Sequence, residues 1–104
     1  RGDRLTEHND RYIYEEPGKP CYVRALTFNY YLTKAWDPGW GGNFVWKEPY
    51  RLISPAFNTL VLFNVTTNSH HWVEAVTGDA GEKRLSVTGW YLSEVKQEKY
   101  KLSV

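Results

Sequence analysis

The chain has 104 residues, and its 13 basic and 12 acidic side chains are interspersed, which leaves a formal net charge of +1. The balanced charge excludes the basic footprint of a typical nucleic-acid-binding protein, and no apolar run is long enough for a membrane-spanning helix. We therefore expect no nucleic-acid partner and no membrane partner. A chain of this length forms one domain or part of one, and we expect residues 1–104 to be a single domain.

Strand signals dominate the chain, whereas helical periodicity is scarce. Residues 11–20 combine proline, glycine and charge, which predicts a surface loop. Aromatic and β-branched residues predict a long strand over 22–33, and Asp-Pro-Gly and Gly-Gly sequences predict a turn over 35–42. Further strands are predicted over 43–47, 50–53, 57–65, 71–77 and 84–93, with a polar turn at 66–69 and a hairpin loop at 78–83. Short strands separated by turns indicate an all-β sandwich or jelly roll.

Two histidines and an aspartate are candidate metal ligands. His8 and Asp10 are two residues apart, so in extended backbone both side chains point to one face. With His71, they supply the two imidazoles and one carboxylate of the facial triad that binds non-haem Fe(II) and leaves positions open for a cosubstrate and oxygen. An isolated His-x-Asp is common on ordinary protein surfaces, so this interpretation needs support from the rest of the chain.

The stretch SHHWVEAV, residues 69–76, places two histidines side by side. Neighbouring residues on a strand point to opposite faces, so at most one of His70 and His71 can easily face a shared interior site. Alternation alone does not say which of the two does so.

An ordered series of short motifs extends across most of the chain. In chain order they are Leu5–Asp10, Tyr30-Tyr31-Leu32, Trp36-Asp37, Gly41-Gly42, residues 71–76, Arg84-Leu85-Ser86 and Gly89-Trp90-Tyr91. Each motif is ordinary, but their joint order and spacing resemble the 2-oxoglutarate- and Fe(II)-dependent dioxygenases, in particular the prolyl-hydroxylase-like branch. The resemblance implies a double-stranded β-helix, a relative of the jelly roll, in agreement with the predicted strands.

The resemblance implies that His8, Asp10 and His71 bind Fe(II). It selects His71 over its neighbour because Val73 and Val76 complete the family pattern His-x-Val-x-x-Val. His70 would then face solvent, support the metal site from outside or line the substrate entrance.

The resemblance further implies that Tyr31, Arg84 and Ser86 bind the carboxylate of 2-oxoglutarate that lies away from the metal. Arginine pairs bidentately with a carboxylate, and Arg84 and Ser86, two apart on a strand, can face the same ligand. Tyr30 is assigned to the opposite face, and Trp90 is expected in the core.

The implied activity is hydroxylation of a C–H bond in a prolyl or other amino-acid residue or in a small molecule, with succinate and CO2 as coproducts. Its partner would be a protein, peptide or small-molecule substrate, and ascorbate is a further optional cofactor. Tyr12, Tyr14 and the rest of the 11–20 loop would border the substrate. Two alternatives stay open: a non-catalytic jelly-roll module that binds a metal or another ligand, and a cupin-type enzyme, although cupins present a His-x-His pair that residues 8–10 do not match.

Two further features concern the origin of the chain. Its lone cysteine, Cys21, cannot form an internal disulfide, which favours a reducing compartment such as the cytoplasm. The chain begins within polar sequence and contains no methionine, and few residues precede the His-x-Asp. We therefore expect a fragment that lacks N-terminal helices and a strand of the family fold, with apolar sheet surface left exposed.

Overall fold

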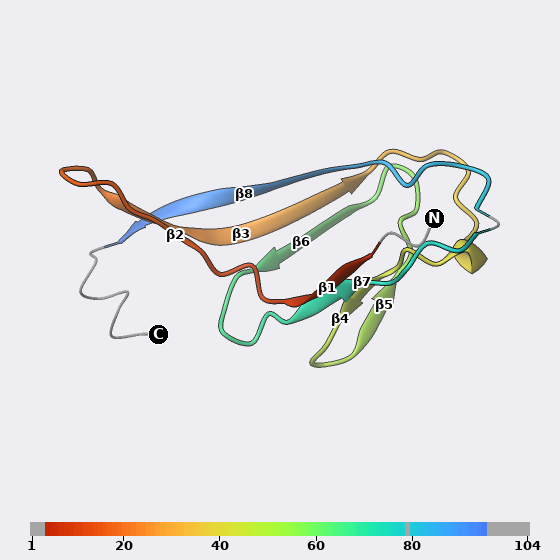
Figure 1. Ribbon diagram of the computed structural model, residues 1–104, viewed down its shortest axis with the longest axis horizontal. Helices are drawn as coiled ribbons and strands as arrows, with labels where there is room; N and C mark the ends of the chain where they lie inside the picture. Colours follow the sequence, from red (N-terminus) through yellow and green to blue (C-terminus); the bar gives the residue numbers. More distant parts are fainter. Residues whose placement is uncertain (1–3, 79, 96–104) are drawn as a thin grey trace.

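The computed structural model describes residues 4–78 and 80–95, which form two antiparallel sheets of four strands each (Figure 1). In the first sheet the strand order is β1 (Leu5–His8), β7 (His71–Val73), β4 (Phe44–Trp46) and β5 (Arg51–Ile53). The second sheet contains β2 (Ile13–Tyr14), β3 (Cys21–Tyr31), β6 (Leu60–Asn64) and β8 (Ser86–Val95). A single-turn 3-10 helix, η1 (Pro38–Trp40), lies between β3 and β4.

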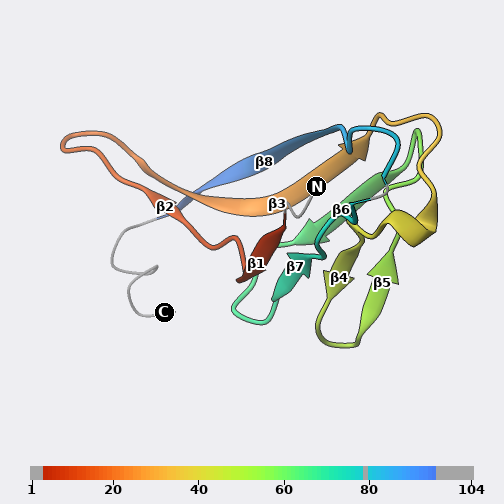
Figure 2. The same ribbon diagram turned by 45° about the vertical axis from the view of Figure 1, so that its right-hand side comes forward.

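The long strand β3 organises the second sheet. β8 pairs with it from Cys21 to Tyr31 along one edge, with a register shift in the middle. β2 pairs with the first part of β3 and β6 with the second part, so these two short strands share the other edge. The 45° turn in Figure 2 shows β2, the start of β3 and the end of β8 extending together beyond the first sheet.

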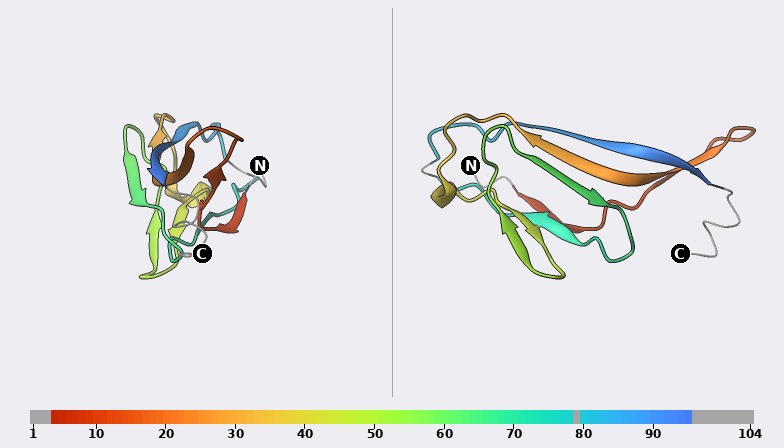
Figure 3. Two further views of the ribbon diagram at one scale, coloured as in Figure 1. Left: turned by 90° about the vertical axis from the view of Figure 1, so that its left-hand side faces the viewer. Right: turned by 180° about the vertical axis from the view of Figure 1, so that it is seen from behind.

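The right-hand view of Figure 3 shows β3, β6 and β8 of the second sheet lying over the strands of the first sheet. Alternation along β3 turns Thr27 and Tyr31 inward, where they are 1% and 0% exposed. Tyr31 packs with Phe44 and Val61 in the main core cluster, joined by the partly buried Trp46, Ile53 and Phe63. A second cluster, with Trp36, Val76, Ala80 and Trp40, lies around η1.

The predicted all-β jelly-roll class is confirmed, and the strand positions agree apart from their ends. One prediction was wrong: residues 11–20 are not all loop, because Ile13 and Tyr14 pair with Val23 and Tyr22 as β2. The proline and glycine act at the tip of this hairpin, where Gly18 has φ +77°. Turn chemistry therefore describes the tip and not the whole segment.

Two other strands differ from the prediction, one in length and one in position. The strand expected over 71–77 ends at Val73, and Val76 makes an isolated bridge with Gly41. The strand expected over 84–93 begins at Ser86, so Arg84 precedes β8. Residues 78–83 lie in the connection between β7 and β8, and the described ones among them make no strand pairing. Ala80 of this loop is buried in the second core cluster.

The outer face of the β6–β3–β8 sheet is apolar and exposed. Leu60, Leu62, Val87 and Tyr91 are at least half exposed there. These four residues pair with residues of β3 whose side chains point away from the core. Paired residues of neighbouring strands point to the same face, so these four side chains lie on the outer face of the sheet. No helix in residues 4–78 and 80–95 is long and apolar enough to cross a bilayer.

Candidate metal centre and cosubstrate pocket

Three potential ligand atoms converge between the two sheets. Among the described residues, His8, Asp10 and His71 form a group whose ligand atoms all lie within 4.8 Å of one another. Asp10 Oδ1 lies 2.8 Å from Nε2 of His8 and 3.6 Å from Nε2 of His71. Register explains the approach, because antiparallel pairing of β1 with β7 sets His8 opposite His71.

Backbone carbonyls fix the tautomer of both histidines. Nδ1 of His8 lies 2.7 Å from the Thr6 carbonyl oxygen, and Nδ1 of His71 lies 2.8 Å from that of Ser69. A carbonyl oxygen can only accept, so each Nδ1 carries a proton and each neutral ring has its lone pair on Nε2. Two such lone pairs and a carboxylate oxygen repel one another unless a metal ion or a proton lies among them. The donor set therefore fits a divalent metal, with the outer hydrogen bonds usual for metal-bound histidine.

Asp10 reaches this point by a turn, which corrects the extended His-x-Asp geometry expected from spacing. β1 ends at His8, and Asp10 has φ +67°, in the left-handed region that aspartate tolerates better than most residues. Burial raises the pKa of Asp10, but interactions with His71, Thr27 and His8 outweigh it and lower the pKa to about 2. Asp10 is therefore a carboxylate at neutral pH.

His71 lies within an aromatic enclosure, and it is 3% exposed. Its ring centroid is 4.8 Å from that of Phe63, 5.2 Å from that of Phe44 and 6.2 Å from that of Trp46. This packing holds the ring orientation in which Nε2 points at Asp10. His70 lies just before β7 and contacts Glu7 instead, with 3.4 Å between Nδ1 and the carboxylate.

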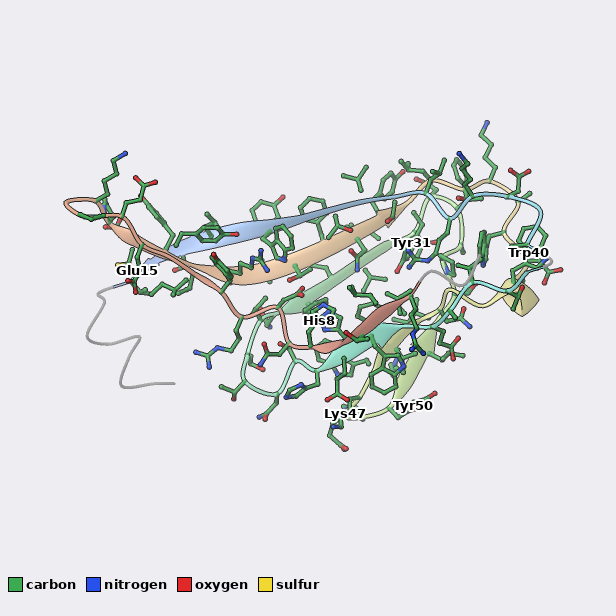
Figure 4. All side chains as sticks on the ribbon, in the orientation of Figure 1. His8, Glu15, Tyr31, Trp40, Lys47 and Tyr50 are labelled. Carbon is green, nitrogen blue, oxygen red and sulfur yellow. The ribbon has the colours of Figure 1, made fainter. Side chains whose placement is uncertain are left out.

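A cavity of about 1640 Å³ opens beside these ligand atoms and is lined by strands of both sheets. His8, Asp10 and His71 line it together with Arg84 and Ser86. Figure 4 labels His8 beside β1 and Tyr31 near the end of β3, whereas Lys47 and Tyr50 lie at the outer edge of the first sheet. A ligand in this cavity can reach the imidazoles and the guanidinium at once.

Arg84 is a cationic residue of the pocket wall, and Tyr31 lies against it. The Arg84 guanidinium carbon is 5.3 Å from the centroid of the Tyr31 ring. The Tyr31 hydroxyl is fully buried and has no hydrogen-bond partner among the described residues. Burial also raises the pKa of Tyr31, against the opposing charge of Arg84, so the hydroxyl remains a proton donor at neutral pH. A buried unpaired donor beside a guanidinium fits an anionic ligand such as a carboxylate.

Backbone contacts hold Arg84 in place, although it lies outside the strand. Its Nε donates a hydrogen bond of 2.7 Å to the Gly42 carbonyl. Buried Thr33 binds both neighbours of Arg84, because its hydroxyl donates to the Lys83 carbonyl and accepts from the Leu85 amide. Gly42 has φ +66°, and a Cβ there would lie 2.9 Å from Cδ of Arg84. The Gly41-Gly42 pair therefore makes room for Arg84 as well as forming a turn.

The structure places five of the six predicted site residues on the wall of this cavity, and the sixth, Tyr31, lies buried against Arg84. Not all of them lie as expected. Ser86 is exposed on the cavity wall at the first position of β8. Trp90, expected in the core, is 37% exposed and also lines the cavity. Thr27, Thr33 and Ser69 were missed by the sequence interpretation, although Thr27 shares a strand face with Tyr31, four residues away, which was an available signal.

Comparison with known proteins assigns the chain to a family. Residues 1–92 match the sequence profile of the 2OG-Fe(II) oxygenase superfamily, and the chain belongs to this superfamily.

A solved relative narrows the branch to one that is prolyl-hydroxylase-like. The chain is 27% identical in sequence to a Pseudomonas putida prolyl-4-hydroxylase, with a TM-score of 0.64. The match covers 86% of this chain and 44% of the solved structure, so the chain spans less than half the length of that enzyme.

Proposed function

We propose that this chain is the core of a 2-oxoglutarate- and Fe(II)-dependent dioxygenase that hydroxylates a C–H bond of a prolyl or other amino-acid residue or of a small molecule, releasing succinate and CO2. The observation that carries the proposal is the convergence of His8, Asp10 and His71 on a cavity that Arg84 also lines. The Tyr31 hydroxyl, which has no hydrogen-bond partner among the described residues, is buried beside Arg84. Membership of the superfamily supports the choice of metal and cosubstrate.

His8, Asp10 and His71 would hold the metal through Nε2, Oδ1 and Nε2. Two neutral imidazoles and one carboxylate leave part of the coordination sphere of a six-coordinate ion free. When bound there, Fe(II) with 2-oxoglutarate supplies the oxygen-activating chemistry. The carbonyls of Thr6 and Ser69 keep the imidazoles in the tautomer that can bind, and the aromatic rings around His71 exclude water from that side.

Arg84, Tyr31 and Ser86 would bind the carboxylate of 2-oxoglutarate that lies away from the metal. Thr27, which binds Asp10, and Tyr31 lie on one face of β3 at a separation of about 13 Å along the strand. The long Arg84 side chain and a five-carbon diacid can together span the space between the two positions. Arg84 supplies charge and two parallel donors, Tyr31 a protonated hydroxyl, and Ser86 a further hydroxyl on the cavity wall.

Binding and turnover test the proposal directly. Wild-type protein loaded with Fe(II) is expected to bind 2-oxoglutarate and to form succinate, measured by calorimetry and by succinate release in the presence and absence of ascorbate. The His71→Ala variant is expected to lose metal binding because it lacks one of the three ligands. Candidate proline-containing peptides and free amino acids can then be compared by the succinate each one elicits.

His70→Ala is the matched control, since it removes the neighbouring imidazole that contacts Glu7. It is expected to retain metal affinity. Equal losses in the two variants would mean that the assignment of His71 is wrong. A wild-type protein that binds neither metal nor 2-oxoglutarate would contradict the enzyme proposal and favour a non-catalytic jelly-roll module.

A further inference from the structure

The two oxygens of the Asp10 carboxylate have different surroundings. Oδ1 faces the Nε2 atoms of His8 and His71, at 2.8 and 3.6 Å. Oδ2 points to the second sheet, where the hydroxyl of Thr27 donates a hydrogen bond of 2.9 Å and the indole N–H of Trp90 a longer one of 3.4 Å. One oxygen is therefore directed to the metal position and the other is held away from it.

Thr27 is placed on β3 so that it can serve Asp10 without reaching the solvent. It is 1% exposed, and its hydroxyl lies on the inward face of the strand. The carboxylate it binds is also buried, with 8% of the Asp10 side chain exposed. A hydrogen bond to a buried charged group is stronger than an exposed neutral one, and its loss leaves Oδ2 with a weaker partner.

Trp90 comes to the same oxygen from the partner strand. β8 pairs with β3 so that Trp90 lies directly opposite Thr27. Its indole is held by Arg24, whose guanidinium carbon is 3.7 Å from the ring centroid. Arg24 also donates to the backbone carbonyl of Asp10, at 3.4 Å, and to the hydroxyl of Tyr14, at 3.0 Å. Arg24 thus links the indole to the turn that carries the carboxylate.

We propose that Thr27 and Trp90 are positioning residues that bind Asp10 Oδ2 and thereby make this carboxylate a one-oxygen ligand of the metal. The inference rests on the proposed metal centre. If Oδ2 were free, rotation of the carboxylate could bring both of its oxygens to the metal. The second oxygen would then occupy a coordination position that the cosubstrate or oxygen needs. The hydrogen bonds from Thr27 and Trp90, which lie opposite each other on β3 and β8, prevent this rotation.

Co(II) binding to the full chain tests the inference, because its affinity and visible spectrum both report the ligand set. Thr27→Val keeps the β-branched shape and removes the hydroxyl. It is expected to weaken Co(II) binding by about 10- to 100-fold, the range usual for outer hydrogen-bond partners of metal ligands, and to change the spectrum. Thr27→Ser restores the hydroxyl, so it is expected to recover most of the affinity and the wild-type spectrum.

Trp90→Phe is a second variant at a more exposed position, and it removes the N–H while keeping an aromatic ring under Arg24. It is expected to shift the spectrum in the same direction with a smaller loss of affinity, because its hydrogen bond is longer. Urea unfolding of the metal-free proteins separates positioning from folding. Weaker Co(II) binding at an unchanged free energy of unfolding supports the inference.

If Thr27→Val and Trp90→Phe both bind Co(II) with wild-type affinity and a wild-type spectrum, the positioning role of Thr27 and Trp90 is overturned while the proposed metal centre stands. If Thr27→Val does not fold, Trp90→Phe decides the question alone by the same two readouts. A wild-type protein that binds no Co(II) would instead overturn the proposed metal centre, and this inference with it.

Discussion

At the residue scale, two neighbouring tyrosines have opposite environments. Tyr31 points inward and its buried hydroxyl lacks a partner among the described residues, whereas Tyr30 points outward and its hydroxyl bonds the side chain of Asn58. The difference follows from strand alternation at the end of β3. A buried hydroxyl without a partner costs about 1–3 kcal/mol, so Tyr31 is better explained by binding than by folding.

Tyr31→Phe should therefore separate stability from binding. The unliganded protein should be as stable as wild type or more stable, because the unpaired hydroxyl is removed while the ring remains. Affinity for 2-oxoglutarate should fall by roughly tenfold or more, since a hydrogen bond to a charged group contributes about 1.5–3 kcal/mol. Urea denaturation and calorimetry measure the two effects.

Tyr30→Phe is the control on the other face of the strand. It should leave 2-oxoglutarate affinity unchanged, although it removes the bond to Asn58. If both variants bind 2-oxoglutarate like wild type, Tyr31 has no role in the pocket.

At the element scale, the segment between β3 and β4 shapes the pocket from behind. The Trp36 indole donates to the Gly41 carbonyl, and Asp37 caps η1 through the Gly39 amide. The chain then passes so close to the strand bridge at Val76 that a Cβ on Gly41 would lie 2.3 Å from the Ala75 carbonyl oxygen. The next residue, Gly42, binds Arg84, so the turn sequence determines where the cation of the pocket lies.

Gly42→Ala should impair 2-oxoglutarate binding beyond its effect on stability. The added Cβ would come within 2.9 Å of Arg84 Cδ and 3.2 Å of its Nε, which displaces the guanidinium. The positive φ also costs a non-glycine residue about 1–2 kcal/mol in the folded state. Thermal unfolding and 2-oxoglutarate calorimetry measure the two losses separately.

Gly18→Ala provides a matched comparison at the hairpin tip, because Gly18 has φ +77° and a Cβ added there would meet no other atom within 4 Å. It should lose similar stability and retain 2-oxoglutarate affinity. Parallel loss of affinity in both variants would show that backbone strain, and not contact with Arg84, is responsible.

At the scale of the whole molecule, the candidate metal site joins the beginning of the chain to its later half. His8 and Asp10 lie on and after β1, His71 begins β7, and Ser69 binds the Asn9 carbonyl at 2.7 Å. Thr27 and Trp90 connect this junction to the other sheet. A metal bound here would therefore link both layers of the fold.

Metal should consequently stabilise the folded protein. Mn(II) at 100 times its dissociation constant should raise the free energy of unfolding by about 2.7 kcal/mol, because only the folded chain brings the three ligands together. Thermal melts with and without Mn(II) measure this shift, which EDTA should reverse. His8→Ala should show no shift, and an equal shift in that variant would place the metal elsewhere.

The sequence predicted the β class because alternation and turn signals are local. Cys21–Tyr31 and Phe44–Trp46 were recognisable as strands, since aromatic and β-branched residues suit a half-buried pleated surface. The hairpin at Ile13–Tyr14 was missed because two residues carry too little periodicity, and their pairing depends on β3. Strand ends at Val73 and Ser86 likewise depend on which partners are within reach.

By itself, the sequence determined which residue types are available: His8, Asp10 and His71 as a donor set, and Arg84 as a cation at family spacing. Only the tertiary structure decided that Asp10 leaves the extended conformation, and that Thr27 and Trp90 meet it from the other sheet. The physical reason is the range of the interactions. Side-chain identity and alternation are encoded locally, whereas the partner of a buried carboxylate oxygen depends on how two sheets pack.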